Sequence, residues 1–176
     1  MHRIRELIKG DAERMQLLTA VASLALPDCY IAAGFVRNLV WDCLHGYERT
    51  SLNDVDVVFF DRANISDDFP NRIQEMLSLL EPSVRWEVKN QAVMHIRNND
   101  QPYASTADAM SYWPEKETAV GVRLNSGAIS VVAPFGVETL FAGCISYNPK
   151  RSRSVFLQRL AEKQWLDKWP RLKVVL

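Results

Sequence analysis

The pattern of apolar and polar positions divides the N-terminal part of the chain into helices. Apolar residues recur at helical spacing over residues 4–25, and Gly10 followed by Asp11 interrupts that pattern. Because Asp is a favoured helix N-cap, we expect a second helix to begin after Asp11 and to end before Pro27. The sequence therefore predicts two consecutive helices before the first strand.

Two short apolar runs, residues 29–33 and 54–60, have the length and the flanking residues of buried strands. Between them, Gly34 breaks the chain into a helix over residues 35–45, with Gly46 as its C′ residue. Further along, the pattern predicts an amphipathic helix at 68–80, an alternating strand at 83–89, a short helix at 106–113, a β-hairpin formed by 119–124 and 128–133, a short helix at 137–142 and a final helix at 156–169.

Length and composition are typical of one soluble globular domain. The chain has 176 residues, of which 48% are hydrophobic and 24% are charged, and no linker or repeat divides it. We expect a single domain over residues 1–176, on which residues 149–176 pack as a basic helical segment. No apolar run approaches the roughly 18 residues of a membrane span, and the charged N-terminus lacks a signal-peptide pattern. We therefore expect no membrane association and a cytoplasmic location.

The charges balance over the whole chain but not along it. With 21 basic and 21 acidic residues, the net charge is zero, which argues against a broad binding surface for long nucleic acid. Residues 150–176 nevertheless carry eight basic and two acidic residues, a balance of +6 beside a body of −6. This basic tail could dock on the acidic body or face a polyanionic ligand.

The cysteines and histidines give no sign of a disulfide framework or a zinc site. Cys29, Cys43 and Cys144 are an odd number without CxxC spacing, and the three His residues are scattered. We therefore expect three reduced thiols.

Asp54 and Asp56 carry the main chemical signal, because they occupy positions i and i+2 of an apolar strand. Alternate strand residues share a face, so the two carboxylates point the same way, where they repel each other and are costly to bury. A divalent cation removes both problems, and Mg²⁺ is commonly held by one or two carboxylates together with substrate phosphates. This pair predicts metal-dependent phosphoryl or nucleotidyl transfer. The alternative is a pair that is only solvated or capping.

Gly34 and Arg37 lie at the start of the helix that follows the first strand. The absence of a Cβ at Gly34 allows close approach of a ligand, and helix N-termini suit phosphate. Arg37 adds a cationic fork for phosphate oxygens, and Lys163 in the final helix is available for phosphate or solvent. A purely structural glycine turn is the alternative.

Glu87, Asn90 and Gln91 are candidates on and after the strand at 83–89. Glu87 is either an exposed edge residue or a third carboxylate beside the Asp pair. Asn90 and Gln91 carry both donors and acceptors, so that they could contact a base or a ribose.

The ordered set of strand, Gly turn, helix with an early Arg and Asp-x-Asp strand resembles the nucleotidyltransferase superfamily, which includes poly(A) polymerases and CCA-adding enzymes. The stretch GFVRN at residues 34–38 resembles the GxVRD stretch of the CCA-adding group, with Asn38 where Asp is usual. The chain is similar over nearly its whole length to a small bacterial family of uncharacterised nucleotidyltransferase-like proteins. The stretches that carry this similarity are AAGFVRN, DVDVVFFD, WEVKNQAVMH, TAVGVRL, VVAPFG and the final KxWxxxWP at 163–170.

This resemblance implies an α+β nucleotidyltransferase fold, with a mixed β-sheet flanked by helices and a short C-terminal helical segment. It implies transfer of a nucleoside monophosphate from an NTP to a small acceptor, with Mg²⁺ (or Mn²⁺) as cofactor. The catalytic and metal-ligating residues would be the three carboxylates, Asp54, Asp56 and Glu87. The nucleotide-binding residues would be Gly34, Arg37, Asn90, Gln91 and Lys163.

Two departures from the resemblance leave a second function open. Ala33 stands where relatives have the first residue of a Gly-Gly or Gly-Ser pair, and the chain is too short for the helical domains that bind RNA in larger relatives. The alternative function is a catalytically inactive nucleotide- or protein-binding module that keeps the fold. A protein partner is a third, separate possibility.

Overall fold

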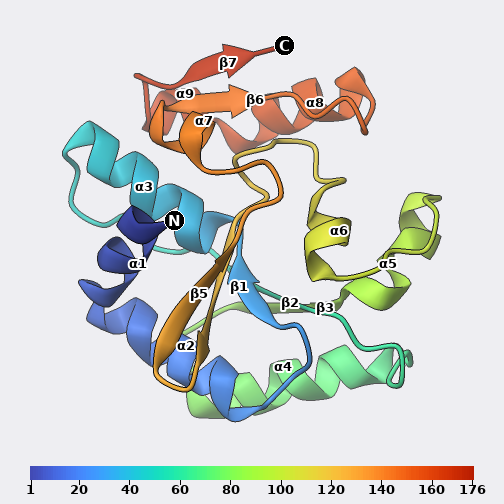
Figure 1. Ribbon diagram of the computed structural model, residues 1–176. Helices are drawn as coiled ribbons and strands as arrows, with labels where there is room; N and C mark the ends of the chain where they lie inside the picture. Colours follow the sequence, from blue (N-terminus) through green and yellow to red (C-terminus); the bar gives the residue numbers. More distant parts are fainter.

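A mixed sheet of five strands, in the order β3-β2-β1-β4-β5, forms the centre of the molecule (Figure 1). The computed structural model describes all residues from 1 to 176. The strands are β1 (Tyr30–Ala32), β2 (Val55–Phe59), β3 (Trp86–Asn90), β4 (Gly121–Asn125) and β5 (Ala128–Val132). Within this sheet, β2 and β3 pair in parallel, and all other neighbouring strands are antiparallel. The expected mixed sheet flanked by helices is confirmed.

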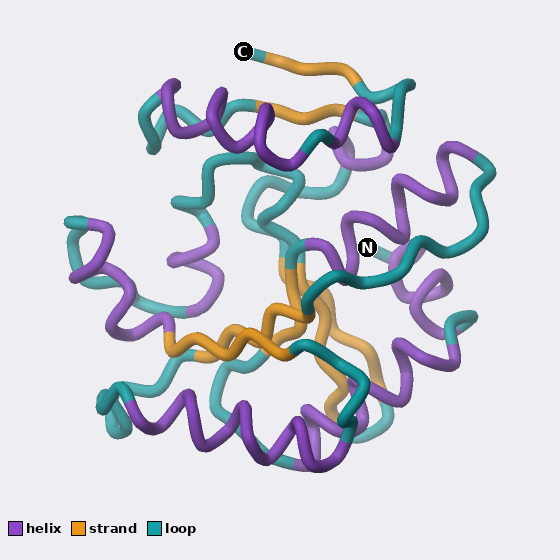
Figure 2. The backbone as a smooth tube through the Cα atoms, turned by 180° about the vertical axis from the view of Figure 1, so that it is seen from behind, coloured by secondary structure: helices purple, strands orange, loops and turns teal.

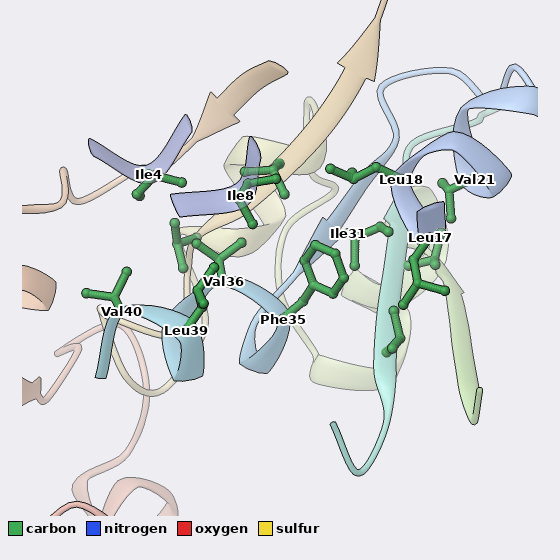
Figure 3. Packing of buried hydrophobic residues seen from close by; sticks show 14 of the residues in the cluster. Ile4, Ile8, Leu17, Leu18, Val21, Ile31, Phe35, Val36, Leu39 and Val40 are labelled. Carbon is green, nitrogen blue, oxygen red and sulfur yellow. The ribbon is translucent and has the colours of Figure 1, made fainter. Parts of the chain in front are cut away.

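The first four helices of the chain pack around this sheet, and they occur where the periodicity predicts them. They are α1 (His2–Lys9), α2 (Ala12–Ser23), α3 (Gly34–His45) and α4 (Asp68–Leu80). The Asp11 side chain caps α2 by accepting from the Arg14 backbone N–H at 3.0 Å, and Gly46 ends α3 in the left-handed conformation. The apolar faces of α1, α2 and α3 meet over β1 (Figure 3), which fixes the start of α3 beside the sheet.

An arm of two short helices, α5 (Gln91–Asn98) and α6 (Thr106–Met110), follows β3. The pattern predicts α6, but it gives no helix at 91–98. The structure shows why one forms there: the Asn90 side chain caps α5, and Asn99 ends it with a φ of 56°. Both capping residues are visible in the sequence, although the short apolar pattern between them is weak.

The C-terminal part forms a layer at one end of the sheet, as both backbone views show (Figures 1 and 2). It contains α7 (Glu138–Phe141), β6 (Cys144–Ser146), α8 (Arg153–Lys163), α9 (Trp165–Lys168) and β7 (Lys173–Val175). The single helix predicted at 156–169 is divided at Gln164, whose φ is 49°. The parallel pair β6–β7 was not predicted, because three-residue strands carry too little periodicity.

Three tryptophans attach this layer to α3. The Trp41 ring lies edge-on to Trp165 and Trp169, with centroid distances of 5.8 and 5.2 Å. Trp169 Nε1 also donates to buried Asp42 Oδ1 at 2.8 Å.

No helix in the chain has the combination of length and hydrophobicity that a bilayer span requires.

Candidate active site

A cavity of about 380 Å³ is lined by residues of the sheet, of α3, of the α5–α6 arm and of the C-terminal layer. Its lining has three parts: carboxylates from β2 and β3, cations from α3, α8 and α9, and a mixed amide and aromatic part from the α5–α6 arm. All but one of the residues that the sequence singles out line this cavity: Asp54, Asp56, Glu87, Gly34, Arg37, Gln91 and Lys163.

The parallel pairing of β2 and β3 brings the carboxylates together. Asp56 is the register partner of Glu87, so both side chains lie on the same face, and Asp54 precedes β2 by one residue. Burial raises the pKa of Asp56, and the negative charges of Asp54 and Glu87 raise it further, while Lys89 opposes them. This end of the cavity therefore holds excess negative charge in a partly buried place.

Lys89 lies among these carboxylates and was not singled out in the sequence as a site residue. Its Nζ donates to Glu87 Oε2 at 2.7 Å and lies 3.7 Å from Asp56 Oδ1. The hydrogen bond from Lys89 is the main reason that the pKa of Glu87 is lowered. The available signal is strand parity, because Lys89 follows Glu87 by two residues and so shares its face.

The chemistry of the donor set fits a divalent cation of the Mg²⁺ type, since all three groups are carboxylates and their charge is incompletely balanced. No three His, Cys, Asp or Glu side chains in the chain are close enough to form a ready-made metal group, however. Glu87 is engaged by Lys89 instead. The Asp54–Asp56 pair is therefore the part of the site most available to a cation.

The turn before α3 has an unusual backbone at Ala33, with φ 54° and ψ −123°. L-residues rarely adopt a positive φ, and this combination is one that glycine favours. The Ala33 carbonyl accepts from the backbone N–H of Arg37 at 2.9 Å, so the turn is fixed to the first helical turn. Gly34 follows and faces the cavity, where a Cβ would lie 3.3 Å from Asn38 Nδ2.

Arg37 reaches the cavity wall from inside the protein. Its Cζ lies 4.9 Å from the Trp41 ring centroid and 4.5 Å from that of Trp165, so the guanidinium is held between two indoles. One terminal nitrogen donates to Thr118 Oγ1 at 2.7 Å and the other to Asn38 Oδ1 at 3.0 Å. Burial lowers the Arg37 pKa to about 10, which leaves it charged at neutral pH.

The C-terminal helices add a second set of cations. Arg159 and Lys163 are one helical turn apart on α8, and Lys168 follows on α9; all three line the cavity. Arg159 Nε donates to buried Glu115 at 2.6 Å, which fixes its position, whereas Lys163 has no such partner. Lys163 thus lies where the sequence prediction needs it, on the wall opposite the sheet.

Asn90 is the exception among the predicted site residues. Its side chain is buried and does not line the cavity. The amide oxygen accepts from the backbone N–H of Asp61 at 3.0 Å and of Ala92 at 3.1 Å, and the nitrogen donates to the carbonyls of Asp61 and Asn64. These bonds use the whole amide, so the predicted base or ribose contact by Asn90 is wrong. Gln91, the next residue, does line the cavity.

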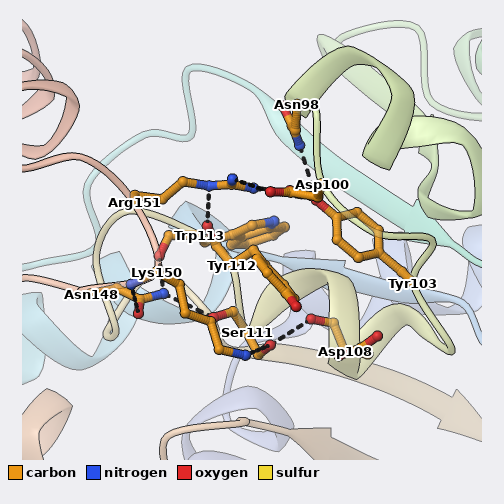
Figure 4. A network of polar contacts seen from close by, with 10 residues as sticks. All are labelled: Asn98, Asp100, Tyr103, Asp108, Ser111, Tyr112, Trp113, Asn148, Lys150 and Arg151. Carbon is orange, nitrogen blue, oxygen red and sulfur yellow. Dashed lines mark hydrogen bonds and ion pairs between the residues drawn. The ribbon is translucent and has the colours of Figure 1, made fainter.

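Aromatic residues of the arm complete the lining, and Tyr103 and Trp113 were not predicted as site residues. A polar network holds this part in place (Figure 4): Arg151 donates to both oxygens of Asp100, at 2.8 and 2.6 Å, and Tyr103 donates to Asp100 as well. Because Arg151 belongs to the loop before α8, this network connects the arm to the C-terminal layer.

Two comparisons with known proteins find relatives of this chain. A protein-family model described as "Nucleotidyltransferase" matches residues 19–174. A solved structure is similar over 99% of this chain and 95% of the other, with 32% sequence identity and a TM-score of 0.86. It is described as an NMR structure that reveals a CCA-adding enzyme head domain. No curated protein sequence matches the chain.

Proposed function

We propose that this chain, which belongs to the nucleotidyltransferase family, transfers a nucleoside monophosphate from an NTP to a small acceptor with the help of a divalent cation. The observation that carries the proposal is the cavity itself. It places the carboxylates of Asp54, Asp56 and Glu87 opposite the cations of α3 and α8, a charge arrangement suited to a nucleotide with its metal.

Asp54 and Asp56 would hold Mg²⁺ or Mn²⁺, and Glu87, the register partner of Asp56, would join them as a third carboxylate after its hydrogen bond to Lys89 opens. The bound cation would neutralise charge on the phosphate oxygens and make an acceptor hydroxyl more acidic. Glu87 would also accept the proton of that hydroxyl or orient it. A carboxylate is ionised at neutral pH and accepts hydrogen bonds, which is what orienting that hydroxyl requires.

The phosphates would lie toward α3 and α8. The α3 N-terminus at Gly34 offers backbone N–H groups, and Arg37 and Lys163 offer positive charge that offsets the charge developing on the leaving pyrophosphate. Arg37 is held rigidly by its two indole neighbours and by Thr118, so little side-chain entropy is lost when it meets a phosphate. Gln91 is the remaining candidate for contact with the base or the ribose.

A small acceptor is favoured over a polymer for two reasons. The cavity volume of about 380 Å³ lies within the range of small-molecule sites. In addition, the chain has no net charge, whereas proteins that bind long nucleic acid use an extended basic surface. The mixed lining from the arm, with Tyr103 and Trp113, offers such an acceptor both flat apolar surface and hydrogen-bonding groups.

Nucleotide binding and pyrophosphate release test the proposal. Calorimetry with each of the four common NTPs at millimolar Mg²⁺ should detect binding to the wild type, and Asp54→Asn and Asp56→Asn should abolish it while circular dichroism shows a folded protein. Pyrophosphate release should then appear with at least one small hydroxyl acceptor, such as a sugar, an aminoglycoside or an amino acid. A wild type that binds no NTP under these conditions contradicts the proposal.

A second candidate function is a nucleotide- or protein-binding module without catalysis. The ion pair between Lys89 and Glu87 favours it, because it engages the third carboxylate, and so does the strained Ala33 in the turn. This candidate predicts NTP binding without pyrophosphate release on any acceptor, or a protein that co-purifies with the chain. The two assays above therefore separate it from the transferase.

A further inference from the structure

Lys89 has no part in the transfer proposed above, yet its ammonium lies against the carboxylates of Asp56 and Glu87. It donates to Glu87 Oε2 at 2.7 Å and lies 3.7 Å from Asp56 Oδ1. Asp56 and Glu87 are cross-strand partners, and Lys89 is the next residue of β3 on the same face. The pairing of β2 and β3 thus fixes the position of Lys89, whose ammonium group contacts carboxylates of both strands.

The contacts of Lys89 are those of a counter-ion. Burial, with repulsion from Asp54 and Glu87 added to it, raises the pKa of Asp56, and the charge of Lys89 at 3.7 Å opposes that shift. For Glu87, the hydrogen bond from Lys89 is the largest influence, and it lowers the pKa. One ammonium group therefore supplies to two carboxylates the positive charge that a divalent cation would otherwise supply.

This arrangement conflicts with a metal site that uses Glu87. No three acidic or other ligating side chains form a ready-made metal group in this conformation. A cation bound between Asp56 and Glu87 would meet a like charge within a few ångströms, which is strongly unfavourable where water is partly excluded. The lysine side chain is 38% exposed and unbranched, so it is free to turn into the open part of the cavity.

We propose that Lys89 is an internal counter-ion that competes with the divalent cation: it holds Asp56 and Glu87 together in the metal-free protein and has to leave Glu87 before that carboxylate can serve as a metal ligand. The inference rests on the metal site of the proposed function, and it adds a positioning residue to that site. It explains how Asp56 and Glu87 remain together without a metal, and it makes metal binding and the opening of the Lys89–Glu87 pair one coupled event.

Metal affinity measured without substrate tests this inference. Mn²⁺ binding is followed by electron paramagnetic resonance of the free ion, and Mg²⁺ by calorimetry, for the wild type and for Lys89→Met. Removal of the competing ammonium should tighten Mn²⁺ binding about tenfold, which corresponds to about 1.4 kcal/mol. Lys89→Arg, which keeps the charge, should bind Mn²⁺ no more tightly than the wild type.

Arg85→Met is the matched control. Arg85 also acts on Glu87 through its charge and belongs to the same strand region, but it does not line the cavity and makes no hydrogen bond to the carboxylate. If competition at the ligand is the cause, this variant should change Mn²⁺ affinity much less than Lys89→Met. An equal increase in Mn²⁺ affinity in the two variants would show that the loss of one positive charge near the site is sufficient, and it would overturn the inference.

A second signal follows Lys89 directly. In the wild type, the side-chain ammonium of Lys89 should give a protected signal in ¹⁵N nuclear magnetic resonance, and Mg²⁺ should remove or shift it, while backbone amide signals of α1, which does not line the cavity, serve as internal reference. Equal Mn²⁺ affinity of wild type and Lys89→Met, with an unchanged Lys89 signal, contradicts the inference and leaves the proposed function intact. Absence of Mn²⁺ binding to both proteins rejects the metal site and this inference together. NTP binding and pyrophosphate release then decide separately whether any transferase function remains.

Discussion

Ala33→Gly should not destabilise the protein, although it removes a buried methyl group. Ala33 is 6% exposed and has φ 54° and ψ −123°. An L-residue in such a sparsely populated region costs about 1–3 kcal/mol, and glycine removes that cost. The substitution loses about 0.4–1 kcal/mol through the greater freedom of the unfolded chain and about 0.8 kcal/mol through the missing methyl. The sum of these terms is centred near about 0.5 kcal/mol in the stabilising direction, between limits of about 0.8 kcal/mol destabilising and about 1.8 kcal/mol stabilising.

Ala32→Gly is the matched control for this prediction. Ala32 is the preceding residue, is fully buried in β1 and has no positive φ, so its replacement suffers the same two losses without relief of strain. We expect it to destabilise by about 1–2 kcal/mol. Urea denaturation followed by circular dichroism gives both values, and thermal unfolding should separate the midpoints by about 2–4 °C per kcal/mol for a chain of this length. Equal destabilisation by the two substitutions would show that Ala33 is not strained.

Three further predictions concern the surroundings of the site. Asn90→Ala should lower the free energy of unfolding by about 2–3 kcal/mol, because it removes an N-cap and leaves buried backbone groups unpaired, while NTP affinity of the folded protein stays unchanged. Trp169→Phe should cost about 1–3 kcal/mol in urea denaturation, since the buried oxygen of Asp42 loses its donor. Hydrogen bonds from Arg151 lower the pKa of Asp100, so this pair stabilises the protein above the unfolded pKa, near 3.9, and that stability is lost as the pH falls through the folded pKa. Urea denaturation between pH 6 and 3 should therefore show a weaker pH dependence for Asp100→Asn than for the wild type.

Each of these three predictions can be contradicted by a specific result. Reduced NTP affinity with unchanged stability in Asn90→Ala would return that residue to the binding site. Full stability of Trp169→Phe would mean that water or another donor satisfies Asp42. A pH dependence identical in wild type and Asp100→Asn would mean that the ion pair with Arg151 does not link proton binding to folding.

Within single elements, the sequence was a good guide. The period of two in residues 54–60 places Asp54 and Asp56 on one face, and the structure has both at the cavity. The Gly34 break, the Gly46 C′ residue and the Ser126–Gly127 hairpin turn each follow from local backbone preferences, and φ is positive at Gly46, Ser126 and Gly127. Such features depend on residues a few positions apart, which is the range over which periodicity and turn chemistry act.

The role of the Asn90 side chain could not be predicted from the residues next to it in the sequence. Its amide can read a base or cap a helix, and nothing in the neighbouring residues decides between these uses. The structure decides, because the chain after β2 returns to Asn90 and supplies the Asp61 and Asn64 partners. Hydrogen bonds with residues almost thirty positions away in the sequence occupy the donors and acceptors of this side chain.

Residue patterns are enough to predict a pair of carboxylates near a strand, a glycine turn before a helix, a basic C-terminal segment and a family resemblance that the comparisons confirm. How these features come together follows from long-range pairing and packing. The register of two parallel strands placed Glu87 beside Asp56, the packing of three tryptophans brought α8 and its cations over the sheet, and the same register put Lys89 between the carboxylates. The physical reason is that a side chain's direction follows from its own backbone, whereas its neighbours are set by long-range pairing and packing over the whole chain.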